Sequence, residues 1–127
     1  MKGSYNNQYT PPAPAVEIWL ARPRGALEVG PLPALLDTGA DASLIPLAYL
    51  DRLRLKPIRQ KSLRSQWGER RSVGIYRIEM RIGDSLHLPW VEVVGDELGD
   101  EVLLGRNVLN QLRIVLNGPG QSVEVTG

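Results

Sequence analysis

The stretch Leu35-Leu36-Asp37-Thr38-Gly39-Ala40-Asp41 is the part of this sequence that decides the fold. Two apolar residues lead into an aspartate, a hydroxyl residue and a glycine, which is typical of a buried strand that ends in a tight turn. Gly39 suits such a turn because glycine tolerates conformations and close approaches that other residues do not. The Asp-Thr-Gly tripeptide occurs once in the 127 residues, and Asp-Ser-Gly does not occur. Chemistry that needs two such carboxylates would therefore need a second copy of the chain.

Length and composition indicate a single globular domain. With 127 residues, 43% of them hydrophobic, the chain can bury one modest core but is too short for two lobes. Fifteen basic and fourteen acidic side chains nearly balance, so no general attraction to nucleic acid or membranes is expected. The sequence has no cysteine for disulfides or metal sites, and one histidine, His87, cannot build a zinc site alone. We expect no metal and no cofactor.

The first residues are polar and proline-rich, unlike a secretory signal or a membrane span. We expect residues 1–15 to form a disordered or extended tail, and residues 16–127 to form the folded domain. The simplest compartment for such a chain is the cytoplasm.

Short alternating segments separated by glycine and proline predict an all-β domain. Strands are expected at residues 16–20, 25–29, 32–36, 74–82, 86–94 and 102–104. A turn is expected at Gly30-Pro31, and a terminal hairpin from residues 113–116 and 122–125. One or two helical turns are expected within residues 47–55, and a short helix at residues 108–112. These elements predict a small closed, β-barrel-like sheet with one short C-terminal helix.

Two separated blocks of the sequence resemble the retroviral-type aspartic proteases, or retropepsins, and their cellular and bacterial single-domain relatives. The first block runs from Leu35 to Ile45 and contains Asp-Thr-Gly-Ala between apolar residues. The second, Leu103-Leu104-Gly105-Arg106-Asn107-Val108-Leu109, is similar to the apolar-apolar-Gly-Arg-Asp/Asn-x-Leu signature that opens the family's helix. The resemblance covers residues 19–116 and implies the acid protease fold, active as a two-fold homodimer.

The resemblance implies a catalytic role for Asp37, Thr38 and Gly39. Asp37 of each chain would share one proton across a water molecule, because two carboxylates about 3 Å apart cannot both ionise. The Thr38 hydroxyl would bond across the two-fold axis, and the Gly39 carbonyl would contact bound peptide. The plainer alternative is an ordinary turn, in which the Thr38 hydroxyl bonds to the local backbone.

The resemblance also implies a peptide cleft beside each Asp37. Small and apolar walls would favour hydrophobic substrate side chains, although the larger apolar residues could equally belong to the core. The residues expected to line this cleft after the catalytic turn are Ala40, Asp41, Ala42, Leu44 and Ile45.

In the family, the residues that match Asp41 and Arg106 form an ion pair that ties the helix to the active-site loop. A further arginine near the N-terminus reaches the same carboxylate from the other subunit. Arg22 is the candidate for that arginine and Arg24 its rival, since a guanidinium group can bind a carboxylate bidentately. The alternative for all of these residues is a solvated charge.

The flap departs from the family pattern. Family flaps are hairpins with glycine-rich tips that close over the substrate and exclude water. Here Ser65-Gln66-Trp67-Gly68-Glu69 takes that place, and Gln66, Trp67 and Gly68 are candidates for substrate binding. Trp67 could pack on the substrate or beside the catalytic loop; the alternative is that it covers ordinary core.

The stretch from Arg52 to Arg81 is strongly basic but lacks aromatic residues placed for base stacking. We expect a solvated face opposite the acidic loop at residues 96–101, and a preference for acidic peptides is the alternative. His87 is expected to be structural.

Together these features predict a homodimeric aspartic endopeptidase, active at mildly acidic pH, whose partners are a second copy of the chain and a peptide or protein substrate. Nucleic acid and membranes are not expected as partners. One alternative is a peptide-binding module of the same fold with weak or no catalysis, and another is a domain excised from a polyprotein. Residues 16–20 or 122–125 could supply the inter-subunit sheet, and we expect both the N-terminal strand and the terminal hairpin to contribute.

Overall fold

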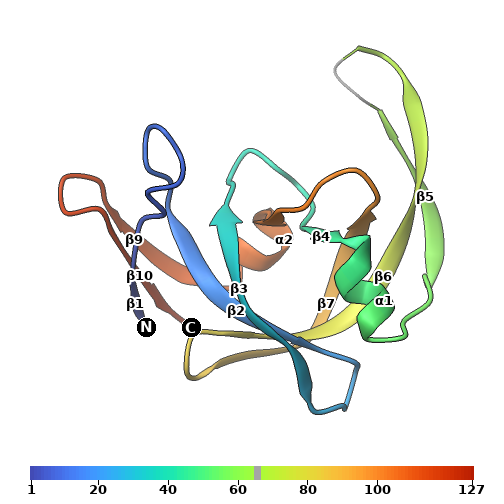
Figure 1. Cartoon of the computed structure of the whole chain (residues 1–127), viewed down its shortest axis with the longest axis horizontal. Helices are drawn as coiled ribbons and strands as arrows, with labels where there is room; N and C mark the ends of the chain where they lie inside the picture. The colour runs from blue at the N-terminus through green and yellow to red at the C-terminus, as the bar shows by residue number, and fades with distance from the viewer. Residues whose placement is uncertain (65–66) are drawn as a thin grey trace.

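A computed structural model describes residues 1–64 and 67–127 of the chain (Figure 1). No helix in this described part is both long enough and apolar enough to cross a membrane. In chain order, the elements are β1 (Lys2–Ser4), β2 (Ala15–Ala21), β3 (Leu27–Leu36), β4 (Leu44–Pro46), α1 (Leu47–Arg52), β5 (Arg59–Arg64), β6 (Arg70–Ile82), β7 (Leu86–Asp96), β8 (Val102–Leu104), α2 (Arg106–Leu109), β9 (Arg113–Asn117) and β10 (Ser122–Thr126).

Six strands close into a barrel, which confirms the predicted all-β fold. They follow one another in the order β2-β3-β8-β4-β7-β6, and β6 pairs with β2 to complete the ring. Alternate residues of these strands point inward, and Ile18, Leu20, Ile78 and Met80 are fully buried. Burial of each such side chain stabilises the fold by roughly 1.5–3 kcal/mol. The helix expected at residues 108–112 begins earlier, as α2, directly after Gly105.

The turn predicted at Gly30-Pro31 is wrong, because both residues lie within the continuous strand β3. The pairing of β2 with β3 shifts register between Ile18 and Leu20, opposite this point. Gly30 has a φ of 143°, and a Cβ there would lie 2.6 Å from the Trp19 ring. The glycine and proline therefore mark a bulge that bends the strand around the barrel, and long-range pairing overrides the local turn signal.

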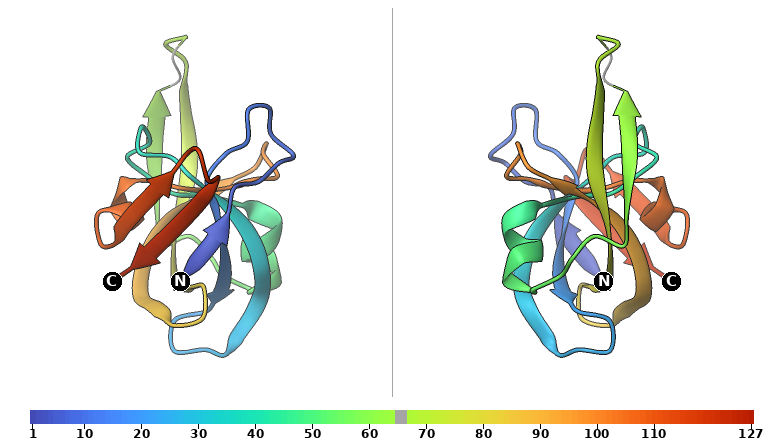
Figure 2. Two further views of the ribbon diagram at one scale, coloured as in Figure 1. Left: turned by 90° about the vertical axis from the view of Figure 1, so that its left-hand side faces the viewer. Right: turned by 90° about the vertical axis from the view of Figure 1, so that its right-hand side faces the viewer.

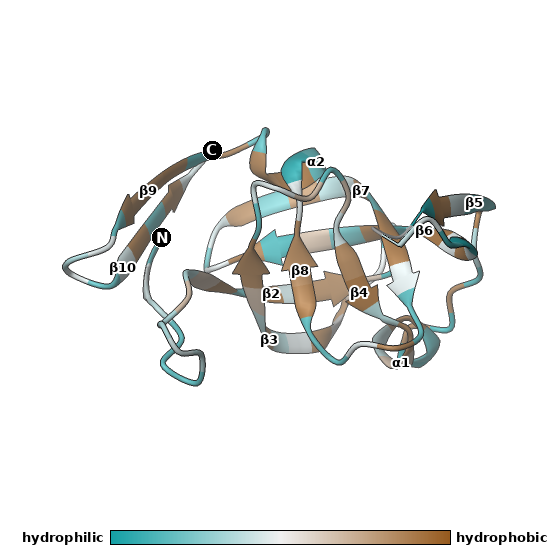
Figure 3. Cartoon of the chain, turned by 90° about the horizontal axis from the view of Figure 1, so that it is seen from above, coloured by the Kyte–Doolittle hydropathy of each residue, from teal (hydrophilic) through white to brown (hydrophobic). Residues whose placement is uncertain are grey.

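The chain termini form a second sheet, in which β10 lies between β1 and β9. The Met1 amine donates to the Val125 carbonyl oxygen at 2.8 Å, and the Tyr9 hydroxyl donates to Glu101. The N-terminal segment thus packs on the rest of the molecule, and both chain ends lie close together (Figure 2). Seen from above, the terminal sheet lies at one end of the barrel and the β5–β6 hairpin at the other (Figure 3).

Neither segment expected to supply an inter-subunit sheet has a free edge. Residues 16–20 belong to β2, which pairs with β3 on one side and β6 on the other. Residues 122–125 belong to β10, which is flanked by β1 and β9. In the described chain, the free edges of the terminal sheet belong to β1 and to β9, the other strand of the terminal hairpin, so the expected contribution of that hairpin to an inter-subunit sheet stays a prediction.

Candidate active site

Asp37 lies directly after β3, in the loop that joins β3 to β4. Its backbone N–H donates to the Leu104 carbonyl oxygen of β8 at 2.9 Å, which extends the parallel pairing of β3 with β8. Its Oδ1 accepts a hydrogen bond from the Gly39 N–H at 2.9 Å, and its carbonyl oxygen accepts one from the Ala40 N–H at 3.2 Å. The half-buried carboxylate is thus oriented by its own turn at the end of a core strand.

The second sequence block packs directly against this loop. The Arg106 backbone N–H donates to the Ala40 carbonyl oxygen, and its guanidinium donates to the Thr38 carbonyl oxygen, both at 2.8 Å. Gly105 approaches the loop so closely that a Cβ would lie 2.2 Å from the Ala42 carbonyl oxygen. The two blocks, more than sixty residues apart in sequence, therefore form one rigid unit around Asp37.

Ser43 joins the same two blocks through its side chain, a role that the sequence reasoning missed. Its fully buried hydroxyl accepts a hydrogen bond from the Gly105 N–H at 3.0 Å and donates to Asn107 Oδ1 at 2.8 Å. The Asn107 amide in turn donates to the Glu92 carbonyl oxygen of β7 at 2.9 Å. The sequence did contain a signal for this role: Ser43 is a small polar residue directly before the apolar residues Leu44 and Ile45. A hydroxyl buried among apolar residues needs hydrogen-bond partners.

The predicted ion pair between Asp41 and Arg106 is replaced, within one chain, by the bond from Arg106 to the Thr38 backbone. Asp41 is exposed and takes part in none of the ion pairs found across residues 1–64 and 67–127. Arg22 lies in the β2–β3 hairpin, at the opposite end of β3, where it donates to the Leu53 and Arg54 carbonyl oxygens at 3.3 Å. Arg22 therefore anchors that hairpin to the end of α1 within one chain, and its contact with Asp41 of the other subunit stays a prediction.

The β5–β6 hairpin occupies the position of the expected flap. It projects beyond the barrel at the end that carries the β3–β4 loop (Figures 1 and 2). The prediction for Gln66 lies outside the described residues. Trp67 is 83% exposed, so the alternative that it covers core is wrong. Gly68 has a positive φ of 85°, as a turn at the tip of a hairpin requires.

Two recesses lie between this hairpin and the barrel. The first has a volume of about 260 Å³ and apolar walls that include Leu44, Leu63, Val73 and Val94. Leu44 is thus available to a ligand, whereas Ile45 is fully buried in the core.

The second recess has a volume of about 150 Å³, and we term it the polar recess because charged side chains contribute to its walls. Asp41 and Ala42 contribute from the Asp37 loop, Arg59 and Lys61 from β5, and Glu92 from β7. Arg59 and Glu92 form an ion pair at 2.5 Å, and the hydrogen bond from Arg59 lowers the pKa of the Glu92 carboxyl. The second recess therefore borders the loop that carries Asp37, and the first lies beside Leu44, where that loop ends and β4 begins.

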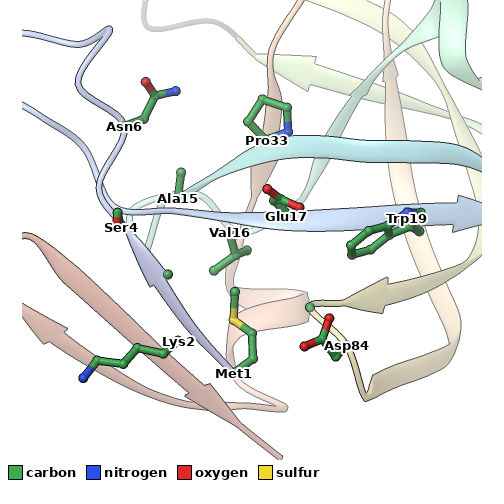
Figure 4. Close-up of a pocket in the computed structure, with 12 residues that line it drawn as sticks. Met1, Lys2, Ser4, Asn6, Ala15, Val16, Glu17, Trp19, Pro33 and Asp84 are labelled. Atoms are coloured by element: carbon green, nitrogen blue, oxygen red, sulfur yellow. The ribbon is translucent and has the colours of Figure 1, made fainter.

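A larger recess, of about 540 Å³, lies between β1, β2 and the β6–β7 turn (Figure 4). Met1, Val16 and Trp19 line it together with the carboxylates of Glu17 and Asp84. It contains no residue of the catalytic loop, so its size does not make it the candidate active site.

Residues 25–111 match the sequence model of the family described as "gag-polyprotein putative aspartyl protease". Because this match covers more than half of the 127 residues, the chain belongs to that family of aspartyl proteases. No curated protein matches the sequence.

Three solved structures are similar in fold. A retropepsin-like aspartic protease from Rickettsia conorii has a TM-score of 0.64 at 11% identity, and the match covers 100% of this chain and 92% of that one. The simian foamy virus (mac) protease has a TM-score of 0.55 at 20% identity, with 76% of this chain and 92% of that chain covered. The EIAV protease in complex with the inhibitor HBY-793 has a TM-score of 0.52 at 22% identity, with 86% and 93% covered.

At these identities the structural likeness shows the fold alone, and the family match adds the chemistry. The chain is accordingly a retropepsin-like aspartic endopeptidase, a hydrolase of peptide bonds.

Proposed function

We propose that the chain acts as a homodimer in which each copy supplies one Asp37 to a shared catalytic centre. The observation that carries the proposal is the Asp37 loop, which is rigidly held at one end of the barrel and occurs once per chain. Peptide hydrolysis by an aspartic protease needs two carboxylates that share one proton, so a second chain must provide the second carboxylate.

The proposed reaction uses a water molecule held between the two carboxylates. The ionised Asp37 removes a proton from the water, which attacks the carbonyl carbon of the peptide bond. The protonated Asp37 of the partner subunit hydrogen-bonds to the carbonyl oxygen and stabilises the tetrahedral intermediate. The carboxyl pair then protonates the departing amine, and no covalent enzyme intermediate forms. The mechanism needs one of the two carboxyl groups protonated and the other ionised, so activity is expected at mildly acidic pH.

The strand that we propose for contact between the copies is β9. It is an edge strand of five residues, and its Val115 and Leu116 are 50% and 51% exposed. The other free edge, β1, has only three residues. Antiparallel pairing of β9 with β9 of a second copy about a two-fold axis would satisfy the free edge and bring Val115 and Leu116, on opposite faces of the strand, beside their counterparts.

Substrate would lie between the Asp37 loop and the β5–β6 hairpin. Ala42 and Leu44 border the two recesses there, and the Asp41 carboxylate is free to accept hydrogen bonds from substrate N–H groups. The hairpin would act as the flap that excludes water from the reaction.

Cleavage of a mixed peptide library at about pH 4 to 7 tests the proposal. We expect the wild-type chain to cut peptides, Asp37→Asn to abolish cleavage, and a statine-type inhibitor such as pepstatin to block it. Asp51→Asn, on the exposed face of α1, is the matched control and should keep full activity. Peptide binding without cleavage by the folded wild-type dimer would instead favour the peptide-binding alternative.

Mixing the two chains tests the sharing of carboxylates directly. When Asp37→Asn and wild type are mixed in equal amounts, the activity per wild-type chain should fall to about half. The reason is that half of the wild-type chains then pair with an inactive partner. Activity that is unchanged by the added variant, after time for subunit exchange, would contradict a shared site.

A further inference from the structure

We infer that Lys61 makes the polar recess beside the Asp37 loop select an acidic side chain of the substrate. This inference rests on the proposed function, because it requires a peptide between the β5–β6 hairpin and the catalytic loop. It adds a substrate class that neither the fold nor the family specifies.

Lys61 lies on the face of the hairpin that looks onto the barrel. In the β5–β6 ladder, Lys61 is opposite Val73 and Leu63 is opposite Arg71. Residues of these pairs line the two recesses, whereas Gln60 and Ser72 bond to each other on the other face. A substrate that enters the cleft therefore meets the Lys61 side.

The other cations on this inner face already have partners. Arg59 pairs with Glu92 at 2.5 Å, and Arg71 pairs with Glu97 at 3.5 Å. Lys61 takes part in none of the ion pairs found in the described portion of the chain. Its ammonium is thus a positive charge of the recess that is not engaged in an ion pair among the described residues and is available to a ligand.

Asp41 is the remaining carboxylate of the polar recess, and its position explains why it does not cancel Lys61. It belongs to the catalytic loop, along which the peptide backbone would run, and backbone N–H groups are hydrogen-bond donors. Lys61 lies across the recess on β5, where a side chain of the peptide would reach. In one acidic residue of the substrate, the backbone N–H would therefore donate to the Asp41 carboxylate, and the side-chain carboxylate would pair with the Lys61 ammonium.

The charge of the whole hairpin acts in the same direction. Residues 59–71 contain five cations and one carboxylate. A cleft covered by such a segment attracts acidic substrates over a distance of about 10 Å at moderate salt.

The two recesses together define a pattern in the substrate. Both are lined by Val94, so they are neighbours. In an extended peptide, side chains two residues apart point the same way and are separated by about 7 Å. We therefore expect an aliphatic side chain in the apolar recess and an acidic one two positions away in the polar recess.

Cleavage-site profiling of a random peptide library with the full chain identifies the position that favours acidic residues. Two peptides that differ only by Glu or Gln at that position then give the ratio of their kcat/KM values. We expect wild type to favour Glu about fivefold, as for a partly exposed ion pair, and the ratio to fall at high salt.

Lys61→Met should bring the ratio of the kcat/KM values for the Glu and Gln peptides close to one, and Lys61→Glu should bring that ratio below one. Lys56→Met is the matched control, since Lys56 is an exposed lysine in the segment before β5, and it should keep the ratio. An unchanged ratio in Lys61→Met would overturn the inference and leave the proposed function intact.

Binding separates failure of the inference from failure of the proposed function. Fluorescence anisotropy with labelled Glu and Gln peptides measures affinity for Asp37→Asn. If wild type gives no cleavage profile, the peptides carry the expected pattern, with an aliphatic residue two positions from the Glu or Gln. Tighter binding of the Glu peptide that is lost in Asp37→Asn/Lys61→Met supports the inference even if the wild type proves inactive. Equal affinities for the two peptides in Asp37→Asn overturn it.

Discussion

At the scale of single residues, Ser43 connects the parts of the site that lie far apart in sequence. Its hydroxyl bonds to the Gly105 N–H and to Asn107, and its carbonyl oxygen accepts from the Val94 N–H at 2.8 Å. One buried residue thus holds the catalytic loop, the start of α2 and β7 in register. Since the bond from the Gly105 N–H is buried, water does not readily replace the hydroxyl as its acceptor.

Ser43→Ala should lower the free energy of unfolding by roughly 1–3 kcal/mol, because it leaves the buried Gly105 N–H without an acceptor. Urea denaturation followed by circular dichroism measures this. Ser72→Ala, at an exposed position of β6, is the control and should stay close to wild type. Equal stability of Ser43→Ala and wild type would show that the hydroxyl does not hold the two blocks together.

At the scale of elements, the β2–β3 hairpin is held to the barrel by charge as well as by pairing. The Arg24 backbone N–H donates to Glu79 on β6, and His87 Nε2 lies 3.0 Å from the other oxygen of the same carboxylate. The bond from Arg24 is the main cause, and His87 the next, of a lowered pKa of the Glu79 carboxyl. His87 is therefore part of a structural contact at the end of the barrel away from Asp37.

Glu79→Gln should weaken the dependence of stability on acid. The pKa of Glu79 is lower in the folded chain than in the unfolded chain. Its ionised form therefore stabilises the fold at pH values above the pKa of the unfolded chain, and this stabilisation is lost as the pH falls through the pKa of the folded chain. Unfolding free energies measured from about pH 6 to pH 3 should thus fall less steeply in Glu79→Gln. An identical slope in the variant and wild type would contradict this role.

At the scale of the whole molecule, the strands of the terminal sheet are paired within one chain and do not need a second copy to form the sheet. β1, β10 and β9 already pair within one copy, and β10 has no free edge. Only the outer edges remain for a second copy, and the exposed apolar residues lie on β9. The proposed dimer is therefore an edge-to-edge joining of two folded chains, with no exchange of strands.

Val115→Lys should break the proposed dimer without unfolding the chain, because like charges would meet at the two-fold axis. Sedimentation should then show a monomer, and activity should be lost at protein concentrations where wild type is dimeric. Leu27→Lys, an exposed apolar position at the far end of β3, is the control and should remain dimeric. A dimeric Val115→Lys would place the interface elsewhere.

Much of the fold could be predicted from local patterns. Alternation of apolar residues located the barrel strands, and Leu103-Leu104 followed by Gly-Arg-Asn marked the block that packs on the Asp37 loop. The prediction of a turn at Gly30-Pro31 was wrong, because glycine and proline occur in both bulges and turns. Only the pairing of β3 with β2 distinguishes the two. Register across a barrel is a long-range property that a local pattern does not contain.

The sequence by itself determined the class of protein, since the blocks around Asp37 and Arg106 carry the family resemblance, which the match over residues 25–111 confirms. The single Asp-Thr-Gly per chain is the ground for the proposed second copy. Only the tertiary structure decided how the site is built. Arg106 bonds to the Thr38 backbone and not to Asp41, Arg22 lies at the far end of β3, and Lys61 faces the polar recess. These facts depend on which strand edges meet and which face a hairpin turns to the barrel, and both are set by packing between residues distant in sequence.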